Sequence, residues 1–283
     1  VTPFDDDGAL KVDAAVKLAK WLTENGSDGL VLTGTTGEGP VLTDDEDVEL
    51  WRAVVEAVTV PVVAGTGTND TRHTIELTKR AADCGAVGAL VVTPYYNRPP
   101  QAGIEAHFRA VAESTKLPIL IYDIPIRAGR RVALDTFVRL SDVANIVGVK
   151  DAALDVAGSA ALRAAMPESF EIYSGNDDQT LALVAAAGAV GVISVAAHWA
   201  GVHMAEMVAA AEKGDLGHAR EVNRRLLSSY DFETSETAPN PIPTKAMMRV
   251  MGHSVGQCRL PMGPAPAGLE DEARRVLADL QRA

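Results

Sequence analysis

The sequence predicts a (β/α)8 barrel with a small C-terminal helical appendix, because strand-like and helix-like segments alternate along most of the 283 residues. Seven apolar, β-branched runs are typical of buried strands: Asp28–Gly34, Val60–Gly67, Ala89–Pro94, Leu117–Pro125, Asn145–Lys150, Phe170–Gly175 and Val190–Ala196. An eighth strand is expected at the N-terminus, where Val1 to Phe4 resemble a strand end, and we expect a short segment to precede Val1. A doubly wound open sheet is the alternative fold.

The segments between these runs favour helices. Asp44–Val58 and Thr71–Gly85 are rich in helix-forming residues, and Thr43 followed by Glu46 is a capping-box pattern. After about residue 214 the strand patterns stop. Helical patterns then continue through three segments: Leu216–Tyr230, Pro243–Met251 and Gly268–Arg282. We therefore expect a catalytic barrel over residues 1–213 and a helical region over residues 214–283.

Composition excludes several classes of protein. A net charge of −12 argues against nucleic acid and anionic membranes as partners. Cys84 and Cys258 are the only cysteines, which suits a reducing cytoplasm and provides neither a disulfide framework nor a zinc site. The six histidines lack metal-binding spacing, so no metal is expected. The absence of a Gly-x-Ser-x-Gly motif argues against a serine hydrolase.

Lys150 is the strongest single candidate for a reacting group. It ends the apolar run that begins at Asn145, and burial disfavours the charged form of a lysine. A lysine amine freed in this way is a nucleophile that can form a Schiff base with a carbonyl compound. The alternative is a lysine that reaches solvent at the strand end and pairs with Asp151.

Other polar side chains follow the predicted strands. In a parallel barrel the carboxyl ends of all strands face one mouth, so these side chains are expected to gather there. Tyrosine and threonine hydroxyls can move protons beside a Schiff base, and an arginine can grip a substrate carboxylate. The alternatives are tyrosines that pack at the rim, an arginine that is only a solvated charge and a glycine-rich segment that is only a turn. The side chains are Thr35, Thr36, Tyr95, Tyr96, Tyr122, Arg127 and Lys150.

Four motifs in order carry a resemblance to a known family. They are Gly34-Thr35-Thr36-Gly37-Glu38, Thr93-Pro94-Tyr95-Tyr96-Asn97-Arg98-Pro99, Tyr122-Asp123-Ile124-Pro125 and Gly148-Val149-Lys150-Asp151. The chain resembles the dihydrodipicolinate synthase family, within the pyruvate-dependent class I aldolase superfamily that also holds N-acetylneuraminate lyase. The resemblance covers nearly the whole chain, including Pro239-Asn240-Pro241-Ile242-Pro243 and Lys245.

The resemblance implies a role for each matching residue. Lys150 forms the Schiff base with pyruvate, Tyr122 donates and accepts the proton beside it, and Thr35 relays protons between Tyr122 and Tyr96. In the family the equivalent of Tyr96 reaches into a neighbouring subunit's site, so a homodimer or homotetramer is expected. The resemblance implies a covalent imine between Lys150 and pyruvate, and no cofactor is expected.

Four further positions are implied to bind substrate. Thr36 matches the residue that binds the pyruvate carboxylate with backbone N–H groups, and Ile193 matches an apolar residue with a backbone contact to pyruvate. Gly175 is expected to bind substrate as well, and Arg127 matches the arginine that holds the carboxylate of aspartate semialdehyde.

The same resemblance narrows the substrate. Sialic-acid lyases use a Gly-Ser-Thr-Gly-Glu turn and usually lack the arginine that Arg127 matches, so a synthase is favoured. It would condense pyruvate with L-aspartate 4-semialdehyde on the path to diaminopimelate and lysine. Ile126 and the run Ser174 to Asp178 depart from the usual pattern on the side of the second substrate. The alternatives are another pyruvate aldolase acting on a sugar acid or hydroxy-oxo acid, and a non-catalytic metabolite-binding barrel.

Many members of the family are inhibited by lysine in a cleft between subunits. Tyr95 and Asn69 match that cleft, but His73 stands where strongly inhibited members have a glutamate, and Asp44 and Asp47 replace two histidines. A histidine cannot supply the anion that a bound lysine needs. We expect weak or absent inhibition.

Overall fold

The structure, a computed structural model, describes residues 1–282 and divides into two compact units. The first unit holds Val1–Pro61 and the residues from Ser194 onward, and the second unit is Val62–Ile193. The expected division into a barrel over residues 1–213 and a helical region over residues 214–283 stays a prediction, and its last residue lies outside the described ones.

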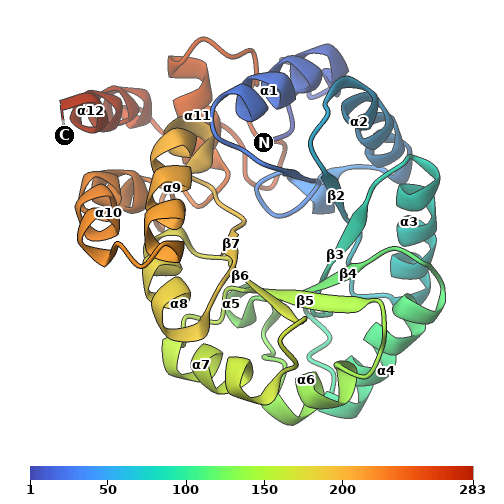
Figure 1. The fold of residues 1–283 in the computed structure, drawn as a ribbon. Helices are drawn as coiled ribbons and strands as arrows, with labels where there is room; N and C mark the ends of the chain where they lie inside the picture. Colours follow the sequence, from blue (N-terminus) through green and yellow to red (C-terminus); the bar gives the residue numbers. More distant parts are fainter. Residues whose placement is uncertain (283) are drawn as a thin grey trace. The chain divides into compact units, whose positions relative to one another are not determined.

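The second unit is a parallel sheet with helices on its outer side (Figure 1). Each strand pairs in parallel with the next one along the chain. A doubly wound sheet reverses its strand order at a switch point. The unbroken chain order in this unit is instead that of a barrel. The strands are β2 (Val62–Gly65), β3 (Gly88–Val92), β4 (Ile119–Asp123), β5 (Ile146–Asp151), β6 (Glu171–Ser174) and β7 (Gly191–Val192).

The helices of this unit follow the strands in alternation. The sheet and the helices enclose an apolar core in which Ile119, Ile121 and Val149 are fully buried. Since side chains alternate along a strand, Tyr122 and Lys150 lie on the opposite face of the sheet from these core residues. The helices are α3 (Thr71–Asp83), α4 (Gln101–Glu113), α5 (Pro125–Ala128), α6 (Leu134–Leu140), α7 (Val156–Ala165) and α8 (Thr180–Ala187), with the short 3-10 helix η2 (Asp177–Gln179).

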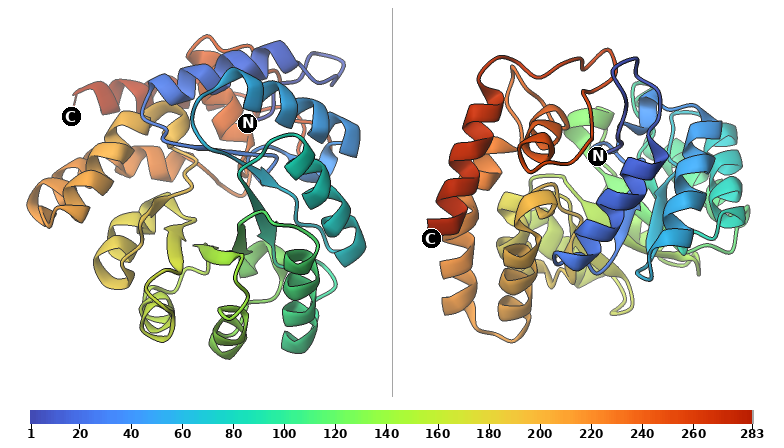
Figure 2. Two further views of the ribbon diagram at one scale, coloured as in Figure 1. Left: turned by 45° about the vertical axis from the view of Figure 1, so that its right-hand side comes forward. Right: turned by 90° about the horizontal axis from the view of Figure 1, so that it is seen from above.

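The first unit is mostly helical. In it α1 packs on α2, α9 packs along α10, and α12 packs against α10 and α11 (Figure 2). The burial of α12 follows one face, at Leu269, Ala273, Val276 and Leu280, a spacing that only a helix produces. The elements are α1 (Val12–Glu24), β1 (Leu30–Leu32), η1 (Gly39–Val41), α2 (Asp44–Ala57), α9 (Ala197–Glu212), α10 (Leu216–Phe232), α11 (Ile242–Val250) and α12 (Leu269–Arg282).

All seven internal strands overlap their predicted runs, and the predicted helices are present with similar bounds. The strand expected at the N-terminus does not form within the described residues. Phe4 makes only an isolated antiparallel bridge with Leu10, and its N–H donates to the carbonyl of Val255. Its backbone is therefore engaged by a local turn and a C-terminal loop, and no parallel ladder forms.

The capping box predicted at the start of α2 is present. Thr43 Oγ1 accepts from the N–H of Glu46 at 3.3 Å, and Glu46 Oε2 accepts from the N–H of Thr43 at 2.9 Å. These bonds satisfy donors that a helix start would otherwise leave unpaired.

We expect Thr43→Ala to lower the free energy of unfolding by about 0.5–2 kcal/mol, because it removes the side-chain acceptor of the cap. Chemical denaturation followed by circular dichroism measures the change. Thr43→Ser keeps the acceptor and serves as the control. Equal unfolding free energies for the alanine and serine variants would show that the cap contributes nothing.

Candidate functional site

Lys150 and Tyr122 lie side by side on neighbouring strands of the second unit. The register of β4 on β5 pairs Tyr122 with Lys150, so both side chains leave the same face of the sheet. Lys150 Nζ lies 4.3 Å from the centroid of the Tyr122 ring, within the range of a cation–π contact. Tyr122 is buried and Lys150 is half-buried. The structure thus brings together the predicted nucleophile and the predicted proton carrier.

Asp151 faces away from Lys150, as successive residues in a strand must. Its carboxylate accepts from Ser159 Oγ at 2.5 Å and from the N–H of Ala153 at 3.0 Å. The alternative reading of Lys150, as a strand-end charge held by Asp151, therefore receives no support from this geometry.

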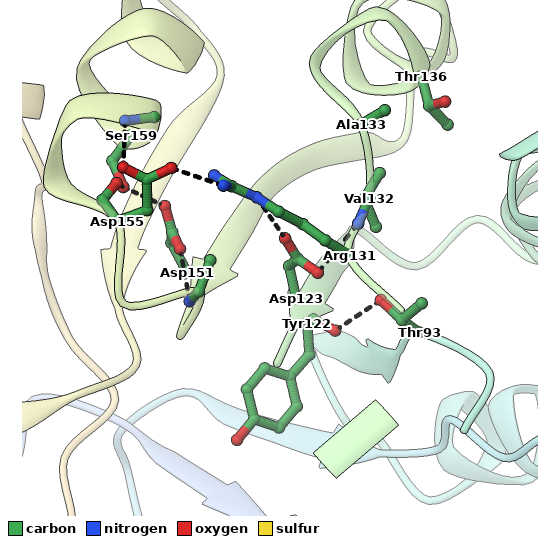
Figure 3. A network of polar contacts seen from close by, with 12 residues as sticks. Thr93, Tyr122, Asp123, Arg131, Val132, Ala133, Thr136, Asp151, Asp155 and Ser159 are labelled. Atoms are coloured by element: carbon green, nitrogen blue, oxygen red, sulfur yellow. Dashed lines mark hydrogen bonds and ion pairs between the residues drawn. The ribbon is translucent and has the colours of Figure 1, made fainter. Parts of the chain in front are cut away.

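Figure 3 shows the polar network on the helix-facing side of the same strand ends. Asp123 Oδ1 accepts from the N–H of Val132 at 3.1 Å, and its other oxygen lies 3.9 Å from Arg131 Nε. Arg131 also pairs with Asp155 at 2.6 Å. Burial raises the pKa of Asp123 to about 7, and the nearby charge of Asp151 also raises it. The hydrogen bond from the Val132 N–H and the charge of Arg131 lower the same pKa and offset part of this effect. These contacts tie the ends of β4 and β5 to the segments that follow them.

Backbone contacts fix the positions next to Tyr122 and Lys150. The N–H and hydroxyl of Thr93 both donate to the Tyr122 carbonyl, at 3.0 and 3.1 Å (Figure 3). Tyr173 pairs with Lys150 in the register of β5 on β6, so it lies beside Lys150 on the same face. Burial, with a hydrogen bond to Glu171, raises the pKa of Tyr173 to about 12. Sequence reasoning missed Tyr173, although its place in the run Phe170–Gly175 is the signal that could have found it.

Gly175 and Ile193 lie at the ends of β6 and β7. The Gly175 N–H donates to the Asp151 carbonyl at 2.8 Å, and the Ile193 N–H donates to the Ser174 carbonyl at 2.9 Å. A Cβ at Gly175 would come within 2.8 Å of the Cβ of Ala152, so only glycine fits there. Since both N–H groups are already engaged, Gly175 would meet a substrate through its carbonyl, and Ile193 through its carbonyl or side chain.

Tyr96 and Arg127 both lie on exposed segments of the second unit. Tyr96 follows β3, is 88 % exposed, and has a φ of 70°, which is uncommon for a residue with a bulky side chain. Arg127 lies in the short helix α5 directly after β4, next to Ile126, which is 78 % exposed. Burial raises the pKa of Tyr95, the half-buried neighbour of Tyr96.

Thr35 and Thr36 lie in the first unit, in a tight turn after β1. Thr33 and Glu38 take positive φ values of 54° and 58°. A Cβ at Gly37 would lie 2.9 Å from the Thr33 nitrogen, so the turn closes on itself only with glycine there.

The Thr36 hydroxyl has a partner that sequence reasoning did not identify. Thr36 Oγ1 accepts from Asn240 Nδ2 at 2.8 Å, and Asn240 Oδ1 in turn accepts from Thr244 Oγ1 at 3.0 Å. Because Thr36 accepts in this bond, its own proton is left to donate elsewhere. In the sequence, the segment Pro239–Pro243 stands out only by its resemblance to the family.

Within residues 1–282 no helix has the length and apolarity needed to cross a membrane. The same residues contain no group of three or more His, Cys, Asp or Glu side chains placed to hold a metal ion.

A parallel α/β unit with a lysine at a strand's carboxyl end against a tyrosine is the arrangement of a Schiff-base aldolase. Comparison with known protein families identifies the family within this class. The model of the dihydrodipicolinate synthetase family matches residues 1–280, and the chain belongs to this family.

Individual relatives are similar to this chain over nearly its whole length. The 4-hydroxy-tetrahydrodipicolinate synthase of Thermosynechococcus vestitus is 44 % identical, over 99 % of this chain and 95 % of its own. The Bacillus anthracis dihydrodipicolinate synthase structure is 41 % identical with a TM-score of 0.94, covering 98 % of this chain and 95 % of that one. The Cyanidioschyzon merolae enzyme, solved with lysine bound, is 38 % identical with a TM-score of 0.95, covering 100 % and 96 %. The predicted fold class, a (β/α)8 barrel with C-terminal helices, is confirmed.

Proposed function

We propose that this chain condenses pyruvate with L-aspartate 4-semialdehyde to form 4-hydroxy-tetrahydrodipicolinate, on the route to diaminopimelate and lysine. Membership of the family and the similarity to its named relatives support this class of reaction. The observation that carries the chemistry is the pairing of Lys150 with Tyr122, with Nζ 4.3 Å from the ring centroid. Of the two, the lysine supplies a nucleophile and the tyrosine a hydroxyl that can exchange protons.

The proposed reaction begins when the Lys150 amine adds to the keto carbon of pyruvate. Loss of water, assisted by a proton from Tyr122, gives the imine. The pyruvate methyl group then loses a proton and the imine becomes an enamine, whose carbon attacks the aldehyde carbon of the second substrate. The amine of the new adduct attacks the imine carbon, closes the ring and releases Lys150. The imine itself takes up the electron pair, so we propose that no cofactor takes part.

The proton route is proposed to use Tyr122, Thr35 and Tyr96, the roles that the family resemblance implies. Tyr96 is 88 % exposed in the single chain, which suits a side chain that is covered only by a partner subunit. We therefore propose a homodimer or homotetramer. The net charge of −12 argues against nucleic acid or an anionic membrane as a partner, and we propose that the protein acts on small molecules in the cytoplasm.

Substrate binding is proposed to use four further residues. Thr36 has a hydroxyl proton to offer the pyruvate carboxylate, while Gly175 and Ile193 offer carbonyl or apolar contacts. Arg127 is proposed to hold the carboxylate of aspartate semialdehyde. Ile126 is exposed beside Arg127 and departs from the usual pattern on the side of the second substrate. One alternative function therefore stays open, that of a related pyruvate aldolase acting on a sugar acid or hydroxy-oxo acid.

Borohydride trapping tests the nucleophile. With pyruvate present, borohydride should reduce the imine to a stable secondary amine, and peptide mass spectrometry should place the added mass on Lys150. Lys150→Ala should remove the adduct and nearly all turnover, because it removes the amine that lies against Tyr122. Lys150→Arg keeps the charge without a condensable amine and should be equally inactive. An adduct on Lys116 or Lys245 in the unaltered protein would overturn the assignment.

Arg127→Ala tests the second substrate. Loss of a charge-assisted contact to a carboxylate should cost about 1.5–3 kcal/mol, or roughly tenfold to a hundredfold in kcat/KM for aspartate semialdehyde. Borohydride trapping with pyruvate alone should be nearly unchanged. Arg72→Ala, another exposed arginine of the same unit, is the matched control. An unchanged kcat/KM would make Arg127 a surface charge and favour the sugar-acid alternative, which parallel assays with N-acetylneuraminate and ketodeoxy sugar acids check directly.

Lysine inhibition is expected to be weak or absent. Burial, with the neighbouring charges of Asp44 and Glu46, raises the pKa of Asp47 to about 8, so this carboxyl is mostly protonated at neutral pH. Asp47 therefore supplies little of the negative charge that a bound lysine needs, and His73 supplies none. An inhibition curve with lysine up to tens of millimolar decides the matter: half-inhibition below roughly 1 mM, about −4 kcal/mol of binding, would contradict this expectation.

A further inference from the structure

The turn that carries Thr35 and Thr36 rests on a buried ion pair. Glu38 Oε1 lies 2.6 Å from Lys245 Nζ, and the two side chains are almost completely excluded from solvent. Both residues belong to the first unit, and neither has a role in the proposed reaction. Removing two opposite charges from water costs several kcal/mol per ion, and an apolar pair would usually stabilise a fold as well. Stability alone is therefore a weak reason for this pair.

Glu38 connects the turn to the rest of the unit at several atoms. Its Oε2 accepts from the backbone N–H of Arg259 at 2.9 Å, and its own N–H donates to the carbonyl of Thr35 at 3.1 Å. Its backbone is in the left-handed region, with φ at 58°. A residue held in that conformation persists where the surrounding contacts determine it. Glu38 therefore links the backbone of Thr35 to a C-terminal loop.

Lys245 is fixed just as firmly on its side. It lies in α11, its Nζ donates to the Gln257 carbonyl at 2.9 Å, and it lies 4.1 Å above the centroid of the Phe4 ring. Burial lowers the pKa of Lys245, and the charge of Glu38 acts in the opposite direction. The ammonium group thus bridges the turn and the loop that contains Gln257.

The same C-terminal segment reaches the turn at other points. The guanidinium group of Arg259 donates to the Val41 carbonyl at 2.9 Å and pairs with Glu46 in the first turn of α2. Asn240 donates to the hydroxyl of Thr36. Contacts from α11 and from the segments before and after it therefore hold the turn at Thr36, at Glu38 and at Val41.

We propose that Glu38 and Lys245 are positioning residues, whose buried ion pair sets the turn at residues 33–39 so that the Thr35 and Thr36 hydroxyls are aimed for the reaction. This inference rests on the function proposed above, in which Thr36 binds pyruvate and Thr35 relays protons. Neither Glu38 nor Lys245 touches substrate. They act through the backbone of the turn.

Lys245→Met tests the proposal, because methionine keeps an unbranched chain but removes the cation. We expect the half-saturating pyruvate concentration for borohydride trapping on Lys150 to rise by about tenfold or more. We expect kcat to fall by about tenfold to a hundredfold, the scale of a displacement near 1 Å. At saturating pyruvate the adduct on Lys150 should still form. A pair that only stabilises the fold would change the unfolding midpoint and leave both kinetic values unaltered.

Arg249→Met is the matched control. Arg249 lies four residues further along α11 and makes its own contacts, with Glu270 at 2.8 Å and the Gly256 carbonyl at 2.7 Å. This variant should lower thermal stability while leaving pyruvate half-saturation and kcat at their original values. Equal kinetic losses in Arg249→Met and Lys245→Met would make the effect a general one of α11 and overturn the specific role of the pair.

A double variant separates positioning from folding. Glu38→Gln with Lys245→Met removes both charges, so no unpaired charge is left buried and the folded state should be recovered even where Lys245→Met unfolds. The double variant should regain thermal stability but keep the raised pyruvate half-saturation. Full recovery of both would overturn the proposal.

The unaltered protein, assayed in parallel, separates a failure of the proposed reaction from a failure of the proposed role of Glu38 and Lys245. Its failure to form any pyruvate adduct would contradict the proposed function. A normal adduct in the unaltered protein, with unchanged half-saturation in the variants, would contradict only the positioning role.

Discussion

The parallel register of β4 on β5 is the constraint on which the candidate site depends. It pairs Tyr122 with Lys150 and Asp123 with Asp151. Because side chains alternate along a strand, a shift by one residue would turn Lys150 into the helix-facing core and place a carboxylate against Tyr122. The apolar residues Ile121 and Val149, fully buried on the helix side, oppose such a shift. The packing of the core therefore also determines that Tyr122 and Lys150 share a face.

This register has a cost on the other face of the sheet, where it buries the Asp123 and Asp151 carboxyl groups. The structure compensates with donors from the segments that follow each strand: the N–H of Val132 for Asp123, and the Ser159 hydroxyl for Asp151. Those bonds hold the strand ends to α7 and to the segment before α6 (Figure 3). Support for Tyr122 and Lys150 thus comes from residues that immediately follow them in the chain, on the opposite face of the sheet.

Sequence reasoning succeeded where the signal was local. Apolar runs with polar ends predicted the seven internal strands, and Thr43 with Glu46 predicted the start of α2. It did not predict the bond from Arg259 to Glu38, which joins residues 221 positions apart, because periodicity carries no information on such pairs. The N-terminal strand was expected because Val1 to Phe4 resemble a strand end, and Phe4 instead bonds to Val255. The roles of Thr35, Tyr96 and Arg127 stay predictions that came from resemblance.

The backbone conformation of the turn after β1 explains why α11, distant in the chain, contacts it. Thr33 and Glu38 are both held at positive φ, and each such residue costs on the order of 1–3 kcal/mol. The bond from the Glu38 N–H to the Thr35 carbonyl maintains part of that conformation locally, and distant contacts to Glu38 support it further. An apolar contact is non-directional and would tolerate a rotated turn, whereas the ion pair and the Arg259 N–H fix the two Glu38 oxygens separately. The C-terminal segment that supplies these contacts is therefore part of the machinery that shapes the turn, not an appendix to it.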